Sequence, residues 1–242
     1  MRYQFVDCRF ELGNPERGRE LYLEGHIPGA AFLSVDTDLS DLSVPEAGRH
    51  PLPSAGHFAE AAGSAGIAQG TFVVAYDQGM TGGAARLWWL LRHFGHEDVA
   101  VLKSGLSSWA GPLRGGAEQI EAARFEPRPR TGDTIDSAEL LQRLDDPRLV
   151  ILDARSAERH RGEPGPDPVG GRIPGSRSLP FPEAFPPPGD LLAAEEIAVY
   201  CGSGVTACVD LLALAEAGRP DARLYPGSWS EWSGRGLLSE RD

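Results

Sequence analysis

An internal repeat constrains the fold of this chain more than any other feature. Four segments of the first half recur in the same order in the second half. The matched pairs are 5–9 with 151–155, 25–30 with 171–176, 73–77 with 197–201, and 102–109 with 225–232. Self-similarity of this kind predicts two copies of one domain.

The spacing between the copies is not constant. It is 146 residues for the first two pairs, for example from Asp7 to Asp153, and 124 residues from Asp77 to Cys201. The first copy therefore carries about 22 additional residues, centred on 35–55. We predict an N-terminal domain at 1–110, a proline-containing linker at 111–134 and a C-terminal domain at 135–242.

Apolar runs of strand length alternate with helical patterns in both halves. We expect strands at 3–7, 30–33, 71–76, 99–102, 150–153, 177–179, 197–200 and 222–225, and helices at 15–24, 57–66, 84–94, 137–144 and 205–217. This alternation predicts an α/β fold in which each domain is a parallel sheet flanked by helices on both faces. Sites in such folds lie at the carboxyl ends of the strands.

The segment 197–207 predicts a reactive cysteine. It reads as an apolar strand, then Cys201, then a Gly-Ser-Gly turn, then a helix that begins near Val205 or Thr206. A helix N-terminus contributes about 0.3–1 kcal/mol to an anion, and each charge-assisted N–H contact about 1.5–3 kcal/mol. We therefore expect a nucleophilic thiolate that needs no neighbouring histidine or metal. The alternative is a buried structural cysteine, which this order of strand, turn and helix disfavours.

Charge and composition narrow the function. A net charge of −12 argues against nucleic acid or an anionic membrane as a partner. The sequence shows no signal peptide and no apolar run of membrane-spanning length. Its three widely separated cysteines do not suggest a disulfide framework, so we expect a cytoplasmic protein. Five arginines between Arg155 and Arg177, against three acids, suggest a local basic field for an anionic ligand.

These motifs closely resemble those of the tandem rhodanese-type sulfurtransferases. The resemblance covers essentially the whole chain and includes both IPG turns, the RLWW run at 86–89, the CGSGVT loop at 201–206 and GSWSEW at 227–232. It implies two rhodanese-like domains, with Asp77 at the loop position of a catalytically inactive first domain. It also implies that Cys201 accepts a sulfane sulfur as a persulfide and passes it to cyanide or a thiol, with thioredoxin among the candidates. No cofactor and no metal is expected.

The resemblance assigns a small anionic donor to the loop. Small residues after the cysteine, Gly202 and Ser203, are typical of the branch that uses 3-mercaptopyruvate, and thiosulfate is the alternative donor. Arg159 matches the arginine that holds the donor's carboxylate or sulfonate. The remaining loop residues expected to contact the donor are Gly204, Val205 and Thr206.

Two further features follow from the resemblance. Asp36 and His50 match an aspartate and a histidine that form a proton relay with Ser203; a surface-loop histidine is the alternative for His50. The second arginine of the 3-mercaptopyruvate branch is missing, because the stretch 163–169 contains none. Arg161 and Arg172 are the candidates to replace it.

Two other functional classes share parts of the pattern. Cysteine phosphatases and arsenate reductases use related folds, but many require an arginine six positions after the cysteine, where this chain has Ala207. A non-enzymatic sulfur carrier would use the same persulfide loop, and the sequence does not separate it from a catalyst.

Overall fold

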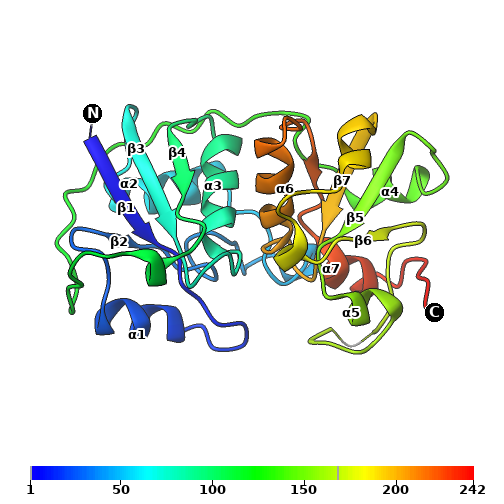
Figure 1. Ribbon diagram of the computed structural model, residues 1–242, viewed down its shortest axis with the longest axis horizontal. Coiled ribbons are helices and arrows are strands. Elements are labelled where there is room, and N and C mark those ends of the chain that lie inside the picture. Colours follow the sequence, from blue (N-terminus) through cyan, green and yellow to red (C-terminus); the bar gives the residue numbers. More distant parts are fainter. Residues whose placement is uncertain (1, 168) are drawn as a thin grey trace. The chain divides into compact units, whose positions relative to one another are not determined.

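The chain forms two compact units, each built around its own four-stranded parallel sheet (Figure 1). The computed structural model describes residues 2–167 and 169–242. The first unit contains the chain up to Asp41 together with Leu52–Arg130, and the second contains Leu42–Pro51 and Thr131–Asp242.

The first unit has the strand order β2-β1-β3-β4. Its strands are β1 (Arg2–Asp7), β2 (Ala31–Phe32), β3 (Thr71–Tyr76) and β4 (Val99–Val101). Its helices are α1 (Arg17–Glu24), α2 (Ala55–Ser64), α3 (Gly83–His93) and the short 3-10 helix η2 (Leu106–Ser108). The helix α3 packs against β3 and β4 and is buried along most of its length, which explains its apolar RLWWLL run.

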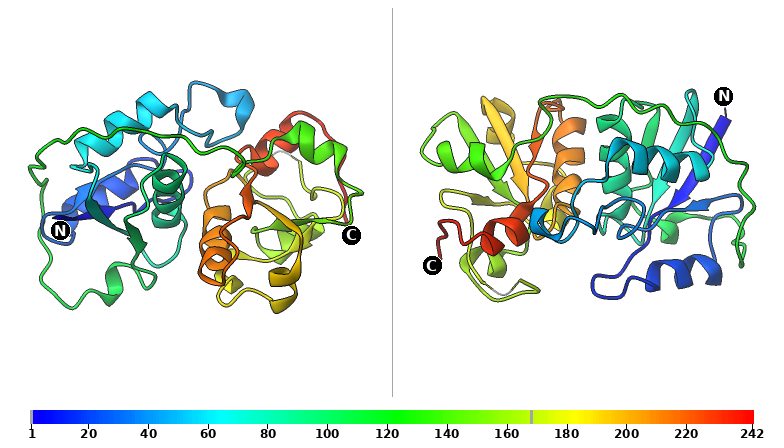
Figure 2. Two further views of the ribbon diagram at one scale, coloured as in Figure 1. Left: turned by 90° about the horizontal axis from the view of Figure 1, so that it is seen from above. Right: turned by 180° about the vertical axis from the view of Figure 1, so that it is seen from behind.

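The second unit repeats this topology with the order β6-β5-β7-β8. Its strands are β5 (Leu149–Asp153), β6 (Arg177–Ser178), β7 (Glu196–Tyr200) and β8 (Arg223–Leu224). Its helices are α4 (Ser137–Gln142), α5 (Ala157–Arg161), α6 (Ala207–Glu216) and α7 (Ser228–Gly234), with the 3-10 helices η1 (Pro45–Ala47), η3 (Phe181–Glu183) and η4 (Gly189–Ala193). Figure 2 shows the helices around each sheet from two further directions.

The predicted α/β class with two parallel sheets is confirmed, and the expected strands and long helices are present within a few residues of their predicted ends. Two short helices, α5 and α7, were not predicted. They span five and seven residues, too few for a hydrophobic period to be recognised.

The segment Leu42–Pro51 lies inside the predicted N-terminal domain, but the structure groups it with the second unit. This segment lies inside the extra residues of the first repeat. The Arg49 N–H donates to Ser230 Oγ at 3.0 Å, and a Cβ on Gly48 would lie only 2.7 Å from the Gly227 carbonyl. Contacts with α7 therefore attach the insertion to the other half of the chain.

The predicted linker also differs from the structure in part. Most of it lies along the first unit as an extended strap, with backbone hydrogen bonds from His26 to Arg114, from Ala123 to Gly63 and from Arg128 to Phe94. Only the end of the stretch, from Thr131, belongs to the second unit. The lack of periodicity in this stretch correctly indicated irregular structure. It did not indicate that the stretch forms hydrogen bonds with the first unit.

A buried ion pair fixes the end of β5. Arg155 donates through Nη2 to Asp153 at 2.5 Å, and both side chains are almost fully buried. Burial alone favours the neutral acid, but hydrogen bonds from His160 and Arg155 outweigh it and lower the pKa of Asp153. The stability that this carboxylate contributes is thus present above its unfolded pKa and is lost as the pH falls through its lower folded value.

We predict that Asp153→Ala destabilises the second unit by about 3–5 kcal/mol, because it leaves a buried guanidinium without its counter-charge. Urea denaturation of the full chain, combined with hydrogen exchange resolved to the two units, measures the effect. Asp190→Ala is the control, because its pair with Arg177 is exposed and its loss should change little. Equal losses in the two variants would contradict the prediction.

Candidate active site

Cys201 directly follows β7, which lies between β5 and β8 in its sheet. The backbone N–H of Gly204 donates to Cys201 Sγ at 3.1 Å. Gly204 has a φ of +79°, and a Cβ there would lie 2.5 Å from the Pro226 carbonyl oxygen. Only glycine fits this turn, and the turn directs an N–H at the sulfur. Helix α6 starts at Ala207, one or two residues later than predicted, so Val205 and Thr206 belong to the loop.

A second loop supports the first. The Ser228 hydroxyl accepts from the Cys201 N–H at 3.1 Å and donates to the Tyr225 carbonyl at 2.9 Å. Ser228 has a φ of +53°, an uncommon value for a residue with a side chain. The N–H of Trp229 donates to the Cys201 carbonyl at 3.0 Å. Trp229 is 1 % exposed, so it is a core residue and not a wall of an open cleft.

The first unit contains a similar strand-turn-helix arrangement with a carboxyl group in place of the sulfur. Asp77 follows β3 as Cys201 follows β7, and its carboxylate is completely buried. Its oxygens accept backbone N–H groups of Gly79 at 2.8 Å, Gly82 at 3.1 Å and Ala84 at 3.2 Å. Three backbone N–H groups thus converge on one side chain in this strand-turn-helix geometry, an arrangement that favours an anion. Asp77 has no sulfur to transfer. The inactivity of the first unit remains a prediction.

The structure brings His50 and Ser203 together. His50 Nδ1 and Ser203 Oγ are 2.8 Å apart, and both residues are buried. His50 lies in the insertion segment that belongs to the second unit. Asp36 belongs to the first unit, and its part in a relay remains a prediction.

Two guanidinium groups lie beside the residue that follows the cysteine. A Cβ on Gly202 would lie 2.8 Å from Arg49 Nη2 and 3.4 Å from Arg159 Nη1. Burial lowers the pKa of Arg49. Burial also lowers the pKa of Arg159, and the neighbouring charges of Arg155 and Arg49 lower it further. In both arginines the interaction with Cys201 acts in the opposite direction. Arg159 thus lies beside the cysteine loop, and its role in holding a donor remains a prediction. Arg49 is a second arginine of the site that the sequence analysis missed.

Neither of the arginines suggested as the second one lies here. Arg172 pairs with Glu240 and Asp242 near the end of the chain, and Arg161 pairs with Glu158 on the surface. Arg155 and Arg177 are also paired with acids. The predicted basic field at 155–177 is thus largely neutralised by carboxylates. Most of them lie near their arginine in sequence, and the two partners of Arg172 lie near the end of the chain.

Asp167 was not singled out by the sequence analysis either. Its carboxylate bridges the two arginines: Arg159 Nη2 donates to Oδ2 at 2.7 Å, and Arg49 Nη1 donates to Oδ1. The Asp167 side chain is 3 % exposed. The sequence did show that the stretch 163–169 lacks the expected arginine. It could not show that Arg49, more than a hundred residues away, binds Asp167 in this stretch.

The other cysteines do not share this environment. Cys208 is buried in α6. Burial raises the pKa of Cys8 well above its usual value, and nearby Asp7, Asp77 and Asp38 raise it further. The raised pKa makes Cys8 a poor nucleophile at neutral pH.

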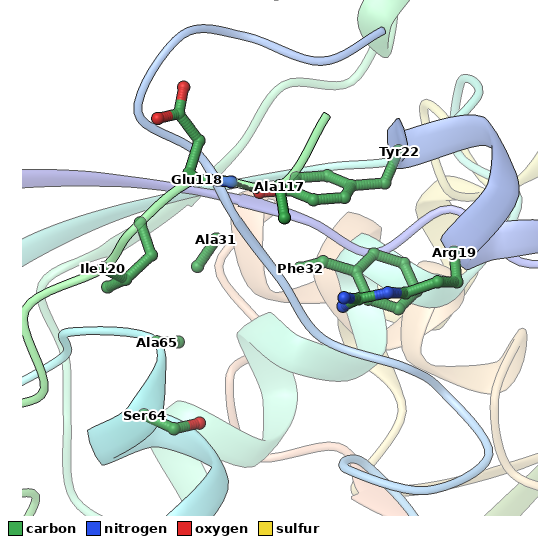
Figure 3. Close-up of a pocket in the computed structure, with 9 residues that line it drawn as sticks. All are labelled: Arg19, Tyr22, Ala31, Phe32, Ser64, Ala65, Ala117, Glu118 and Ile120. Carbon is green, nitrogen blue, oxygen red and sulfur yellow. Dashed lines mark hydrogen bonds between the residues drawn. The ribbon is translucent and has the colours of Figure 1, made fainter. Parts of the chain in front are cut away.

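Other features of the described residues do not suggest a competing centre. A hollow of about 260 Å³ in the first unit contains Arg19 beside the ring of Phe32, with Tyr22 and Glu118 nearby, but no thiol (Figure 3). Over residues 2–167 and 169–242, no group of three or more His, Cys, Asp or Glu side chains is placed to hold a metal ion. Within the same residues, no helix is both long and apolar enough to cross a membrane.

Comparison with known proteins identifies the family. The family model described as a rhodanese-like domain matches residues 1–112 and again 136–235. The chain belongs to the rhodanese-like domain family. A Pseudomonas aeruginosa protein named as a probable 3-mercaptopyruvate sulfurtransferase is 41% identical over 249 residues, covering 94% of this chain and 88% of that protein. The expectation of a tandem rhodanese-type sulfurtransferase is confirmed.

Solved structures give the same result. The 3-mercaptopyruvate sulfotransferase SseA from Escherichia coli superposes with a TM-score of 0.81 at 34% identity, over 95% of this chain and 93% of that one. A probable thiosulfate sulfurtransferase superposes with a TM-score of 0.67 at 30% identity, over 98% and 96% of the two chains. This rhodanese-family enzyme thus has similar relatives named for both donors considered above.

We predict that the two loop glycines respond differently to alanine. Gly204→Ala must adopt an unfavourable φ against a backbone oxygen and should lower stability by at least about 1 kcal/mol. It should also slow alkylation of Cys201, because the N–H that faces Sγ is displaced. Gly202→Ala meets only the flexible ends of two arginines and should leave the melting temperature nearly unchanged. Thermal denaturation and iodoacetamide labelling test this; equal melting temperatures for both variants would contradict it.

Proposed function

We propose that this rhodanese-family enzyme transfers sulfur from 3-mercaptopyruvate through a Cys201 persulfide to a thiophilic acceptor. The observation that carries the proposal is the Ser203–His50 hydrogen bond of 2.8 Å next to the cysteine loop. When 3-mercaptopyruvate loses its sulfur, the leaving group is a carbanion that must be protonated, and the Ser203–His50 pair can deliver that proton. Thiosulfate releases sulfite, which needs no proton.

The first half-reaction balances without any external proton. The Cys201 thiolate attacks the donor sulfur, the S–S bond forms, and the carbon–sulfur bond breaks. Ser203 and His50 move the proton of the donor thiol to the departing enolate carbon. The products are the deprotonated Cys201 persulfide and pyruvate, and the electron pair of the broken bond stays on carbon until that proton arrives.

Binding of the donor is assigned to the arginines and the loop. Arg159 pairs with the donor carboxylate, for which a planar guanidinium is well suited. Arg49 contributes the second guanidinium that this branch usually supplies from another position. We assign the loop residues Gly202, Gly204, Val205 and Thr206 to the donor site, and the Gly204 N–H, which is 3.1 Å from Sγ, can donate to the persulfide anion.

The second half-reaction regenerates the thiolate. Cyanide or a thiolate attacks the outer sulfur of the persulfide, the S–S bond breaks, and its electron pair returns to Cys201. A small thiol or thioredoxin is the acceptor that we favour in a cell. A reducing compartment such as the cytoplasm suits this chemistry, and the three cysteines are free thiols.

Cys201→Ser should abolish sulfur transfer. Incubation of the unaltered enzyme with 3-mercaptopyruvate should add one sulfur, visible by intact mass and removed by cyanide. The control, Cys8→Ala, should still be labelled, because Cys8 lies in the first unit. Labelling of the Cys201→Ser protein, or failure of the unaltered enzyme to be labelled by either donor, would contradict the proposal.

The relay should matter for one donor only. We predict that Ser203→Ala and His50→Gln each lower kcat with 3-mercaptopyruvate by about 100-fold, the usual size of a lost proton transfer. With thiosulfate the loss should be within about fivefold. Steady-state kinetics with both donors and cyanide as acceptor measures this split, and equal losses with both donors would show that the pair serves only to shape the loop.

A further inference from the structure

We propose that Asp167 sets the donor preference of this site, because it holds a fixed negative charge between Arg49 and Arg159. The inference rests on the sulfurtransferase function proposed above. It states that the site favours a donor with one negative charge, such as a mercapto-carboxylate, over a donor with two, such as thiosulfate.

The carboxylate is built into the arginine cluster. Each oxygen of Asp167 accepts from a different guanidinium, Oδ2 from Arg159 at 2.7 Å and Oδ1 from Arg49. The Asp167 side chain is 3 % exposed, against 28 % for Arg49 and 21 % for Arg159. Two guanidinium groups therefore hold the buried carboxylate between them as their shared counter-charge.

The arginines keep unused donors. Asp167 binds one terminal nitrogen of each, Arg49 Nη1 and Arg159 Nη2, and the other terminal nitrogens, Arg49 Nη2 and Arg159 Nη1, lie beside Gly202. Both guanidinium groups also lie against Gly202, next to the nucleophile. The cluster can therefore bind an anion near the sulfur while Asp167 remains where it is.

The charges then decide which anion binds better. Two guanidinium groups and one carboxylate leave a net charge of +1, which a monoanion neutralises. 3-Mercaptopyruvate carries one negative charge at neutral pH, and thiosulfate carries two. The additional charge of thiosulfate is repelled by both Asp167 and the thiolate. We take the second charge of thiosulfate and the Asp167 carboxylate to be roughly 7 Å apart at an effective dielectric constant of about 20. After screening by salt, removal of the Asp167 charge then raises the efficiency with thiosulfate, relative to that with 3-mercaptopyruvate, about tenfold.

A purely structural role for Asp167 makes a different prediction. If the carboxylate only held the loop at 163–170 against the arginines, its loss would weaken both donors to a similar extent. The ratio of the two efficiencies, rather than either value alone, therefore separates the two roles.

The experiment compares kcat/KM for thiosulfate and for 3-mercaptopyruvate in the full-length enzyme at low ionic strength. In Asp167→Asn, which removes the charge, the ratio of thiosulfate to 3-mercaptopyruvate efficiency should rise about tenfold, and the rise should shrink in high salt. In Asp167→Glu, which keeps the charge, the ratio should stay close to that of the unaltered enzyme. Glu163→Gln is the matched control: this exposed acid lies in the same loop, and its loss should leave the ratio unchanged.

Every outcome is decisive. An unchanged ratio in Asp167→Asn, or an equal rise in Glu163→Gln, overturns the inference while leaving the sulfurtransferase function intact. Failure of the unaltered enzyme to react with either donor overturns the proposed function itself. Should Asp167→Asn fail to fold, Arg49→Gln tests the same charge balance from the other side: the ratio should fall several-fold, whereas Arg49→Lys should retain it. No fall in Arg49→Gln would overturn the inference.

Discussion

The cradle for an anion at the end of a central parallel strand is the feature on which the rest of this structure depends. It occurs twice, with the Asp77 carboxylate after β3 and the Cys201 sulfur after β7. In both units the strand delivers the side chain to a turn from which backbone N–H groups donate, three to Asp77 and that of Gly204 to Cys201 Sγ, and a helix follows. In the first unit the cradle binds the Asp77 carboxylate, which has no sulfur to transfer. The second unit uses the same geometry for a nucleophile.

Around the Cys201 cradle, charges are balanced in pairs rather than accumulated. Asp153 holds Arg155 at the end of β5, and Asp167 holds Arg49 and Arg159 beside Gly202. An acidic chain can keep several arginines near one site only if most of them have partners, since unpaired buried cations are costly. The pairing leaves a small positive excess next to the thiol, which suits an anionic donor without attracting anions indiscriminately.

Much of this was accessible from the sequence. Repeated motifs gave two domains, alternating apolar runs gave two parallel sheets, and Cys201 followed by Gly202 and Gly204 gave the reactive loop. These inferences succeed because they depend on neighbours in sequence, where strand length, turn chemistry and helix start are local. Arg49 and Asp167 were missed because neither belongs to a local pattern. Their importance arises from a contact across more than a hundred residues.

The sequence by itself determined the fold class, the repeat and the identity of the nucleophile, because each follows from short-range periodicity and from residue chemistry. Tertiary structure decided which distant residues join that nucleophile. It attached the insertion that carries Arg49 and His50 to the second unit, and it paired Arg49 with Asp167 and Arg172 with Glu240 and Asp242. Such pairings depend on where loops end in space, which short-range preferences along the chain do not encode.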